Sequence, residues 1–341
     1  MRTGAEEIMK QRRMGRTGLK VSEICLGTMT FAGQSDETKS FRILDVATER
    51  GVTFIDTADA YPIPPDPATS GRTEEVIGNW LAAPLARRHQ LVIATKCRIR
   101  TGVGPNDQGL SRRHILAACE ASLRRLRTDY IDLYQAHLPD PETPIDETLR
   151  AFDDLVRSGK VRYAGCSNYP AWQLALALAT SEQHGWSRYD CVQPRYNVLY
   201  REIESELLPL CRDQGVGMIA YNPLAGGLLT GKHTGDEPPG PGTRFTLGAS
   251  GELYRDRYWH RAQFDAVTTL KDYCQGRGWN LATASVAWVL QQPGITSAII
   301  GASRPEQLDL TLAAPELTFD EDARAAFDAV WWSIPRRPVG R

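Results

Sequence analysis

The chain has 341 residues, 42% of them hydrophobic, and its 40 basic residues almost balance its 41 acidic ones. This length allows a large buried core, in one large α/β domain or two smaller ones. The net charge of -1 gives no general attraction to nucleic acid or to an anionic membrane, and no apolar run approaches the roughly 20 residues that span a bilayer.

The first segment of the chain is polar. Residues 1–12 carry charges with no apolar segment behind them, so we interpret them as a polar tail and not as a secretory signal. Residues 14–23 predict a small β-hairpin. No linker follows it, and a single domain is therefore expected over residues 13–341.

Short β-rich runs then alternate with longer amphipathic segments. Strands are predicted over residues 23–27, 52–56, 91–96, 130–137, 161–168, 190–196, 216–222 and 297–303. Helices are predicted over residues 36–50, 73–81, 111–126, 145–158, 172–184, 204–214, 264–290 and 320–332. Eight such units predict an α/β fold, a (β/α)8 TIM barrel whose floor is closed by the N-terminal β-hairpin plug and whose last helix lies beyond the eighth strand. A doubly wound sheet is the competing architecture.

One long loop is expected over residues 222–262, which are rich in Pro, Gly and aromatic residues. Loops of this length usually carry function. The proline-rich insert at residues 62–75 is a second candidate segment. This insert is expected to shape a substrate pocket together with the aromatic residues Tyr254, Tyr258, Trp259, Trp331 and Trp332.

The cysteines and histidines indicate the compartment and argue against a metal site. The seven cysteines are an odd number without a C-x-x-C pair, and several lie in strand-like runs. They predict buried, reduced thiols and a cytoplasmic protein. The six histidines never lie three or four residues apart, so no metal site is predicted.

Polar side chains stand at the end of most predicted strands. They include Asp56, Lys96, His137, Ser167, Asn168, Gln193, Tyr221, Asn222 and Ser303. In a barrel, the carboxyl ends of the strands share one rim, where active groups lie. Taken alone, Asp56 could cap a helix, Lys96 could be a solvated strand end and His137 a structural histidine. Together they predict a proton-handling centre.

Tyr61 completes this centre, because it follows Asp56 in the loop that leaves the second strand. A tyrosine of pKa ~10 is a poor proton donor at neutral pH. A lysine cation about 4 Å from its oxygen would favour the phenolate by about 4 kcal/mol and lower the pKa by up to about 3 units. Tyr61 is therefore predicted to act as a general acid near pH 7, with Asp56 orienting Lys96 and His137 bonding the substrate oxygen.

The order of these residues resembles the aldo-keto reductase superfamily from about Arg13 to Leu312. The matching segments are Asp56-T-A-D-A-Tyr61, Thr95-Lys96, Gln135-A-His137, Gly165-C-Ser167-Asn168 and Ile300-GASRPEQL. The loop Tyr221-NPLAGGLLTGK resembles that of the aflatoxin-aldehyde reductases and the potassium-channel β subunits. The resemblance implies a barrel fold, NADP(H) as cofactor, and reduction of a small-molecule carbonyl to an alcohol.

The resemblance also implies which residues act. It gives the catalytic roles to Asp56, Tyr61, Lys96 and His137. It assigns cofactor binding to Gly27, Thr28, Asp56, Ser167, Asn168, Gln193, Tyr221, Asn222, Pro223, Leu224, Gly226, Lys232, Arg244, Gly301, Ser303, Arg304 and Gln307. Leu310 and Thr311 stand where related sequences often have Glu and Asn.

Two glycine motifs imitate nucleotide-binding fingerprints. Gly226-G-L-L-T-Gly231-Lys232 lacks the Ser or Thr of a triphosphate loop, and the sequence after it cannot open a helix. Gly215-V-Gly217-M-I-Ala220 fits the dinucleotide pattern but follows a helix and opens a strand, the reverse of the context that it needs. We therefore interpret the first as a phosphate-binding loop of another kind, and the second as no fingerprint.

Three other functions stay open at this point. A barrel aldolase could use Lys96 as a Schiff-base nucleophile. A regulatory subunit could hold the cofactor with little turnover. Within the same family, a deoxysugar keto or enoyl reductase is also possible. No nucleic-acid or membrane partner is expected.

Overall fold

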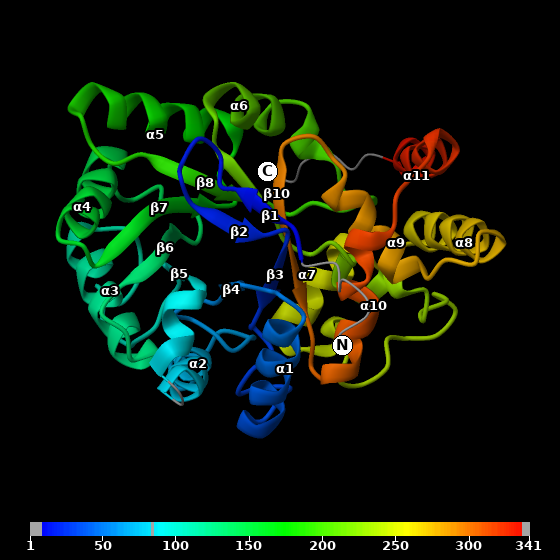
Figure 1. Ribbon diagram of the computed structural model, residues 1–341, viewed down its shortest axis with the longest axis horizontal. Helices are drawn as coiled ribbons and strands as arrows, with labels where there is room; N and C mark the ends of the chain where they lie inside the picture. The colour runs from blue at the N-terminus through cyan, green and yellow to red at the C-terminus, as the bar shows by residue number, and fades with distance from the viewer. Residues whose placement is uncertain (1–8, 83–84, 336–341) are drawn as a thin grey trace, which may run out of the picture.

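A closed barrel of parallel strands forms the centre of the molecule (Figure 1). The computed structural model describes residues 9–82 and 85–335. Within these ranges the strands neighbour one another in chain order, and the last pairs with the first. They are β3 Ile24–Gly27, β4 Phe54–Asp56, β5 Val92–Cys97, β6 Ile131–Ala136, β7 Val161–Ser167, β8 Tyr189–Gln193, β9 Gly217–Ala220 and β10 Ile295–Gly301. The predicted TIM barrel is confirmed.

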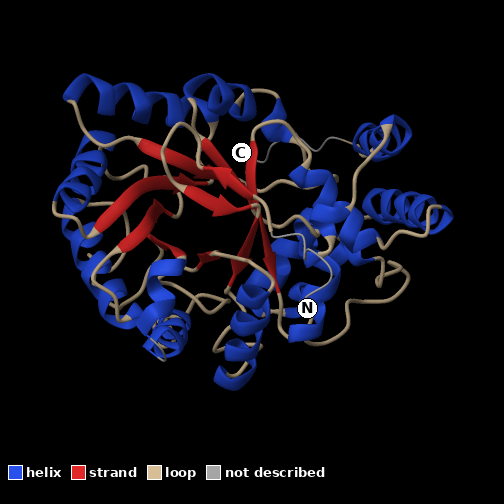
Figure 2. Ribbon diagram, in the orientation of Figure 1, coloured by secondary structure: helices blue, strands red, loops and turns tan. Residues whose placement is uncertain are grey.

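Helices surround the strands on the outside of the barrel (Figure 2). They are α1 Glu37–Glu49, α2 Arg72–Ala82, α3 Arg112–Leu126, α4 Ile145–Arg157, α5 Ala171–His184, α6 Leu207–Gln214, α7 Gly248–Tyr258, α8 Arg261–Gly276, α9 Leu281–Leu290, α10 Leu308–Leu312 and α11 Glu321–Ser333. Several begin at a residue whose side chain accepts a backbone N–H of the first turn, as Asp36, Ser111 and Asp320 do.

The structure corrects three sequence boundaries. The helix predicted over residues 264–290 is two helices, because Gly278 takes a left-handed φ of +69° and Asn280 caps the start of α9. The long loop predicted over residues 222–262 contains α7 and two 3-10 turns. The polar tail predicted over residues 1–12 is too long, because strand β1 (Gln11–Arg13) begins inside it and Met9 is buried; residues 1–8 lie outside the described part.

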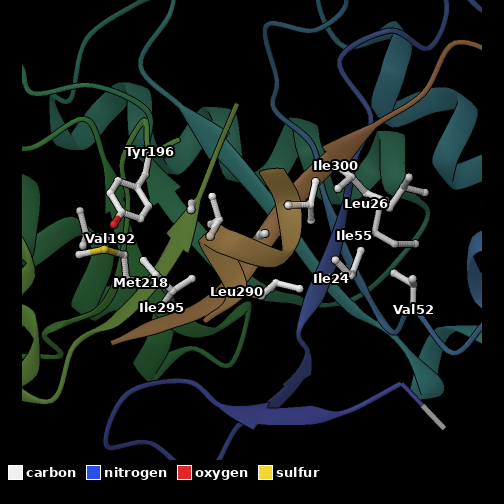
Figure 3. Packing of buried hydrophobic residues seen from close by; sticks show 14 of the residues in the cluster. Ile24, Leu26, Val52, Ile55, Val192, Tyr196, Met218, Leu290, Ile295 and Ile300 are labelled. Carbon is white, nitrogen blue, oxygen red and sulfur yellow. The ribbon is translucent and has the colours of Figure 1, made fainter. Parts of the chain in front are cut away.

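The larger core fills the layer between strands and helices. Because side chains alternate along a strand, Ile24, Leu26 and Ile55 point outward into this layer. Figure 3 shows them with Met218 and Ile300 from the last two strands. This apolar layer fixes each strand against its helix and so fixes where the strand ends lie.

A smaller core fills the inside of the barrel. Its members are Met14, Val21, Cys25, Phe54, Val92, Ala94, Leu133, Cys191 and Ile219. The hairpin of β1 and β2 (Lys20–Ser22) crosses in front of the strands in Figure 1. It closes the barrel floor, as expected, because Met14 is fully buried and a Cβ on Gly217 would lie 2.4 Å from its Sδ. The glycines of the G-x-G-x-x-A pattern thus pack against this plug.

All seven cysteines are buried and unpaired. None of the helices in the described ranges is long and apolar enough to cross a membrane. In the same ranges no three His, Cys, Asp or Glu side chains are grouped so that they could hold a metal ion.

Candidate active site

A polar layer lies above the apolar interior, at the carboxyl ends of the strands. Asp56 and Lys96 point inward from β4 and β5, two residues beyond Phe54 and Ala94 of the inner core. Lys96 Nζ lies 2.5 Å from Asp56 Oδ2 and donates to the carbonyl of Thr57 at 2.8 Å. The lysine side chain is completely buried. The predicted pairing of Asp56 with Lys96 is therefore present.

Two glutamines complete the hydrogen bonding of Asp56. Gln193 Nε2 donates to Asp56 Oδ1 at 2.9 Å, and Gln135 Nε2 donates to the same oxygen at 3.2 Å. Gln193 also donates to Gln135 Oε1 at 3.3 Å. Gln135 was not among the residues expected to act, although it lies two positions after inward-facing Leu133, and the alternation of β6 could have identified it.

Lys96 keeps its charge in this buried position. Burial by itself lowers the pKa of Lys96, but Asp56 and Tyr61 raise it, and the result is a pKa above the ordinary lysine value. The lysine is therefore an ammonium at neutral pH. A buried charge needs a close partner of this kind, since it has lost its hydration.

Tyr61 lies over this pair, in the loop after β4. Lys96 Nζ is 5.3 Å from the centroid of the Tyr61 ring. The pKa of Tyr61 is raised above its ordinary value, because burial outweighs the attraction of Lys96. The sequence-based expectation of a pKa lowered toward neutrality is thus wrong. Asp56 opposes the lysine's effect on Tyr61, and the extent of desolvation cannot be read from the residue pattern.

His137 follows β6 and faces Tyr61. Their rings meet edge to face, with centroids 5.8 Å apart. The backbone of His137 is held on both sides: its N–H donates to Cys97 O at 2.9 Å, and its carbonyl accepts from Asn168 Nδ2 at 3.0 Å. Burial, Lys96 and Arg98 hold the pKa of His137 well below its usual value, so the imidazole is neutral.

A set of amides and hydroxyls continues from His137 along the rim. Ser167 Oγ donates to Gln193 O at 2.8 Å, and Asn168 Nδ2 donates to Ser167 Oγ at 2.9 Å. Asn168 takes a left-handed φ of +60° and accepts the Tyr221 hydroxyl at 2.8 Å. These bonds join the ends of β7, β8 and β9 into one fixed surface.

The glycine loop after β9 folds back over the pocket. Asn222 Oδ1 accepts the backbone N–H of Gly226 at 2.6 Å. Gly226 has a φ of +71°, and a Cβ there would lie 2.7 Å from the ring of Tyr254 on α7. The segment forms a 3-10 helix, η3 (Ala225–Thr230), and no α-helix opens at Lys232. This agrees with the interpretation that the segment is not a triphosphate loop.

Two cations, Lys232 and Arg244, also line the pocket. Arg244 Nη1 is 2.9 Å from Met29 Sδ and 3.4 Å from the Tyr254 hydroxyl, so Arg244 reaches the ends of β3 and β10. Burial and nearby Arg304 lower the pKa of Lys232. Ser303 donates its backbone N–H to Gln307 Oε1 at 2.8 Å.

One cavity of about 530 Å³ unites these groups. Of the residues expected to act, those that line it are Gly27, Thr28, Asp56, Tyr61, His137, Ser167, Asn168, Gln193, Tyr221, Asn222, Pro223, Leu224, Gly226, Lys232, Arg244, Gly301, Ser303 and Gln307. Lys96 lies behind Asp56, and Arg304 is exposed outside the lining. Leu310 and Thr311 line the cavity beside the strand β10 end.

The expectation that the proline-rich insert and the aromatic residues shape the pocket is only partly correct. Tyr254 lines the cavity, as do Ile63 and Pro65 of the proline-rich insert. Tyr258 is buried beneath, where its hydroxyl accepts from Asn197 and Asn222. Trp259 packs on Phe245 and Phe264 instead.

The two C-terminal tryptophans do not shape this cavity. Trp331 and Trp332 belong to α11, which lies at the edge of the molecule beside α8 (Figure 1), and neither lines the cavity. The sequence showed two adjacent tryptophans but not where the last helix packs.

Comparison with known proteins agrees with this geometry. The aldo/keto reductase family model matches residues 23–331. The chain is 42% identical to the "Uncharacterized oxidoreductase YrpG" of Bacillus subtilis (strain 168), over 92% of this chain and 93% of that protein. It is 34% identical to "Protein tas" of Escherichia coli (strain K12), over 94% and 97%. It is 35% identical to a "Probable voltage-gated potassium channel subunit beta" of Arabidopsis thaliana, over 91% and 92%.

The buried pair of Asp56 and Lys96 leads to a prediction about stability. Lys96→Met leaves the Asp56 carboxylate in the barrel without its ammonium, and it should cost about 3 kcal/mol or more of unfolding free energy. Adding Asp56→Asn removes the unpaired charge, so the double variant should recover part of the loss. Urea denaturation followed by circular dichroism measures both.

The control is Lys39→Met, the same substitution in the exposed pair of Lys39 with Asp36. Exposed ion pairs contribute little to the free energy of unfolding, so the urea midpoint of Lys39→Met should stay close to that of the wild type. A double variant as unstable as Lys96→Met alone would show that the lost side-chain packing, and not the unpaired charge, dominates.

Proposed function

The chain belongs to the aldo/keto reductase family, and within it we propose that this protein reduces an aldehyde or ketone to an alcohol with NADPH. The observation that carries the proposal is that Tyr61, His137 and Asp56, which is paired with Lys96, line one cavity together with the cations Lys232 and Arg244. Tyr61 and its neighbours can deliver a proton. The cations suit the phosphates of a dinucleotide.

The cavity has the charge that a dinucleotide phosphate requires. Lys232 and Arg244 line it, and in the part of the chain that the structure describes neither has a carboxylate within ion-pair distance. Asp56 is the one carboxylate among the lining residues, and it is occupied by Lys96. A guanidinium and an ammonium that no described carboxylate neutralises favour a polyanion.

Two glycines line the cavity at the ends of β3 and β10, where the chain packs closely. A Cβ on Gly301 would lie 3.3 Å from Arg244 Nη2, and a Cβ on Gly27 would lie 2.6 Å from the Ile299 side chain. Ser167, Asn168 and Gln193 of the same lining offer amide and hydroxyl groups that suit a carboxamide. Tyr221, bonded to Asn168, adds an aromatic ring beside them.

The proposed division of labour follows from these positions. When bound, the nicotinamide cofactor supplies a hydride to the carbonyl carbon. Tyr61 donates its hydroxyl proton to the carbonyl oxygen, and the oxygen becomes the alcohol. Lys96, held by Asp56, stabilises the negative charge that remains on Tyr61. Neutral His137 can donate a hydrogen bond to the carbonyl oxygen and so orient the substrate.

Two alternatives are weaker. An aldolase would need Lys96 as a neutral amine, but the lysine is buried, bonded to Asp56 and Thr57, and its pKa is raised. The second alternative, a regulatory subunit with little turnover, has support only from the relatives named as potassium-channel β subunits. Steady consumption of NADPH with aldehydes would distinguish a reductase from such a subunit, because the subunit would hold the cofactor without sustained turnover.

The first prediction tests the proton donor. Tyr61→Phe removes the hydroxyl and keeps the ring, so it should lower kcat for aldehyde reduction at least 100-fold, within the range that general acids contribute. The Kd for NADPH should change little, since the hydroxyl need not touch the phosphates. If the variant kept more than a few per cent of kcat while hydride transfer limits the rate, Tyr61 would not be the acid.

The second prediction concerns pH. Tyr61 must be protonated to act, and its pKa lies above the ordinary value of about 10. The proton is therefore present through neutrality and lost at strongly alkaline pH. We expect kcat/KM for reduction to stay level from about pH 6 to pH 9 and to fall only beyond about pH 10. A descending limb centred near pH 7, measured at saturating NADPH, would contradict this.

The third prediction concerns the cofactor. The 2′-phosphate of NADPH suits the cations near Ser303, namely Lys232 and Arg304. We expect at least a tenfold preference over NADH, which is only ~1.4 kcal/mol and within the reach of one charge-assisted hydrogen bond. Arg304→Ala should raise the Kd for NADPH and leave the Kd for NADH nearly unchanged. The control is Arg113→Ala, on the exposed face of α3. Equal Kd values for the two cofactors in the wild type would contradict the prediction.

A further inference from the structure

A second cavity lies at the opposite end of the barrel from the candidate active site. Its volume is about 660 Å³, and the two cavities share no lining residue. It is bounded by the first residues of β7 and β8, by α4, α5 and α6, and by the turn of the β1–β2 hairpin. In Figure 1 this turn reaches toward α5 and α6. We call it the floor cavity, because the strands begin here.

Two arginines of the floor cavity are anchored at the end of α6. The backbone N–H of Arg16, in the hairpin turn, donates to Gly215 O at 2.8 Å, and a Cβ on Gly215 would lie 3.1 Å from the Cβ of Arg16. Arg188 Nη2 donates to the preceding carbonyl, Gln214 O, at 2.9 Å. Both side chains line the cavity, and the charge of Arg16 acts on Arg188. The fold therefore brings two guanidinium groups together here.

No carboxylate is in direct contact with these two cations. Within residues 9–82 and 85–335, neither Arg16 nor Arg188 forms an ion pair. Arg188 Nε is buried, and no acceptor for its hydrogen lies among the same residues. Burial and the charge of Arg16 lower the pKa of Arg188. Neighbouring guanidinium groups with an unsatisfied donor favour an oxyanion, whose oxygens accept several N–H groups at once.

The other charged residues of the lining do not satisfy this pair. Asp190 lies near both arginines, but burial outweighs their attraction and raises the pKa of its carboxyl to about 6. Its remaining negative charge at neutral pH opposes the binding of an anion only in part. Glu182 is exposed on α5. The guanidinium of Arg162 lies 4.4 Å from the centroid of the Tyr130 ring.

Much of the remaining lining is apolar. Val156 of α4, Leu178 of α5 and Leu210 of α6 line the floor cavity, as does Trp186 in the loop after α5. The ring of Trp186 stacks on that of His184, with centroids 4.4 Å apart. A cavity of this volume, with an apolar wall and a few polar groups, is typical of sites for small organic ligands.

We propose that the floor cavity binds a small organic oxyanion, in which a carboxylate or phosphate is attached to an apolar body. Arg16 and Arg188 hold the oxyanion, and the apolar body packs against Leu178, Leu210 and Trp186. Since Arg16 belongs to the hairpin and Arg188 to the barrel wall, the ligand ties the plug to the barrel. This site goes beyond the proposed reductase function and does not depend on it.

The experiment measures binding by calorimetric titration of the full chain, with NADP⁺ present to occupy the active-site cavity. The probes are benzoate and phenyl phosphate, compared with benzyl alcohol, which lacks the charge, and inorganic phosphate, which lacks the ring. We expect a Kd of about 1 mM or tighter for at least one organic anion, and at least tenfold weaker binding of both comparison compounds. The anion with the lower Kd identifies the preferred group. If neither anion binds more tightly than benzyl alcohol, the inference is overturned.

The variants assign the binding to the floor cavity. Arg188→Gln and Arg16→Gln should each raise the Kd of the anion at least tenfold. Asp190→Asn should lower it, because a negative charge is removed, and this gain in affinity cannot come from loss of folding. The matched control is Arg212→Gln, an exposed arginine of α6 that does not line the cavity. Equal Kd values for wild type, Arg188→Gln and Asp190→Asn would contradict the proposal.

Hydrogen exchange then locates the ligand. Bound anion should slow amide exchange in residues 186–190 and 207–215 and should raise the Tm of the wild type. Protection confined to the glycine loop, residues 221–232, would place the anion in the active-site cavity and overturn the inference. Loss of binding in Arg257→Gln, a residue of that other lining, with binding kept in Arg188→Gln, would overturn it as well.

Discussion

The contact between Asp56 and Lys96 is the constraint on which the site depends. Two opposite charges lie inside a barrel, where each would be costly alone, and each is held because the other is 2.5 Å away. The alternation along β4 and β5 turns both side chains inward, and Gln135 and Gln193 from two further strands bind the second carboxylate oxygen. The closed ring of strands brings these four side chains together. The fold is therefore what makes the ion pair possible, and the ion pair in turn fixes the surroundings of Tyr61.

Dehydration is the second consequence of this architecture. The inner apolar core and the hairpin plug close the barrel below the polar layer, and Asp56, Tyr61 and His137 line the cavity above it. This burial keeps Tyr61 protonated and His137 neutral. In the proposed reaction, a donor with a raised pKa would be a weaker acid, but it would be fully protonated when a carbonyl binds. Lys96 would then stabilise the charge that develops on the Tyr61 oxygen.

Much of this could be predicted from the sequence, because strands with alternating or continuous apolar residues end in recognisable polar groups. Asp56, Lys96, His137 and Asn168 were identified as candidates from these strand ends, after the barrel had been predicted from eight alternating strand and helix units. Helix α7 was missed because Gly248–Tyr258 contains two glycines, few apolar residues and several charges, a composition that gives no clear apolar stripe. The direction of the Tyr61 pKa was missed for another reason. It depends on how much water the fold removes, and no local pattern of residues records that.

Helix α7 also separates two tasks that a single loop would have to combine. Tyr258 anchors the helix, since its hydroxyl accepts hydrogen bonds from Asn197 and Asn222 at 3.0 Å each. Ser250 and Leu253 line the cavity from the preceding turns, and within the described residues neither side chain forms a hydrogen bond of this kind to the barrel. Substitutions at such positions can alter the ligand surface while the attachment of the helix and the interior of the barrel stay intact. A lineage descended from this chain could therefore diverge in the compounds that it accepts through a few changes in one turn of helix, without rebuilding its chemistry.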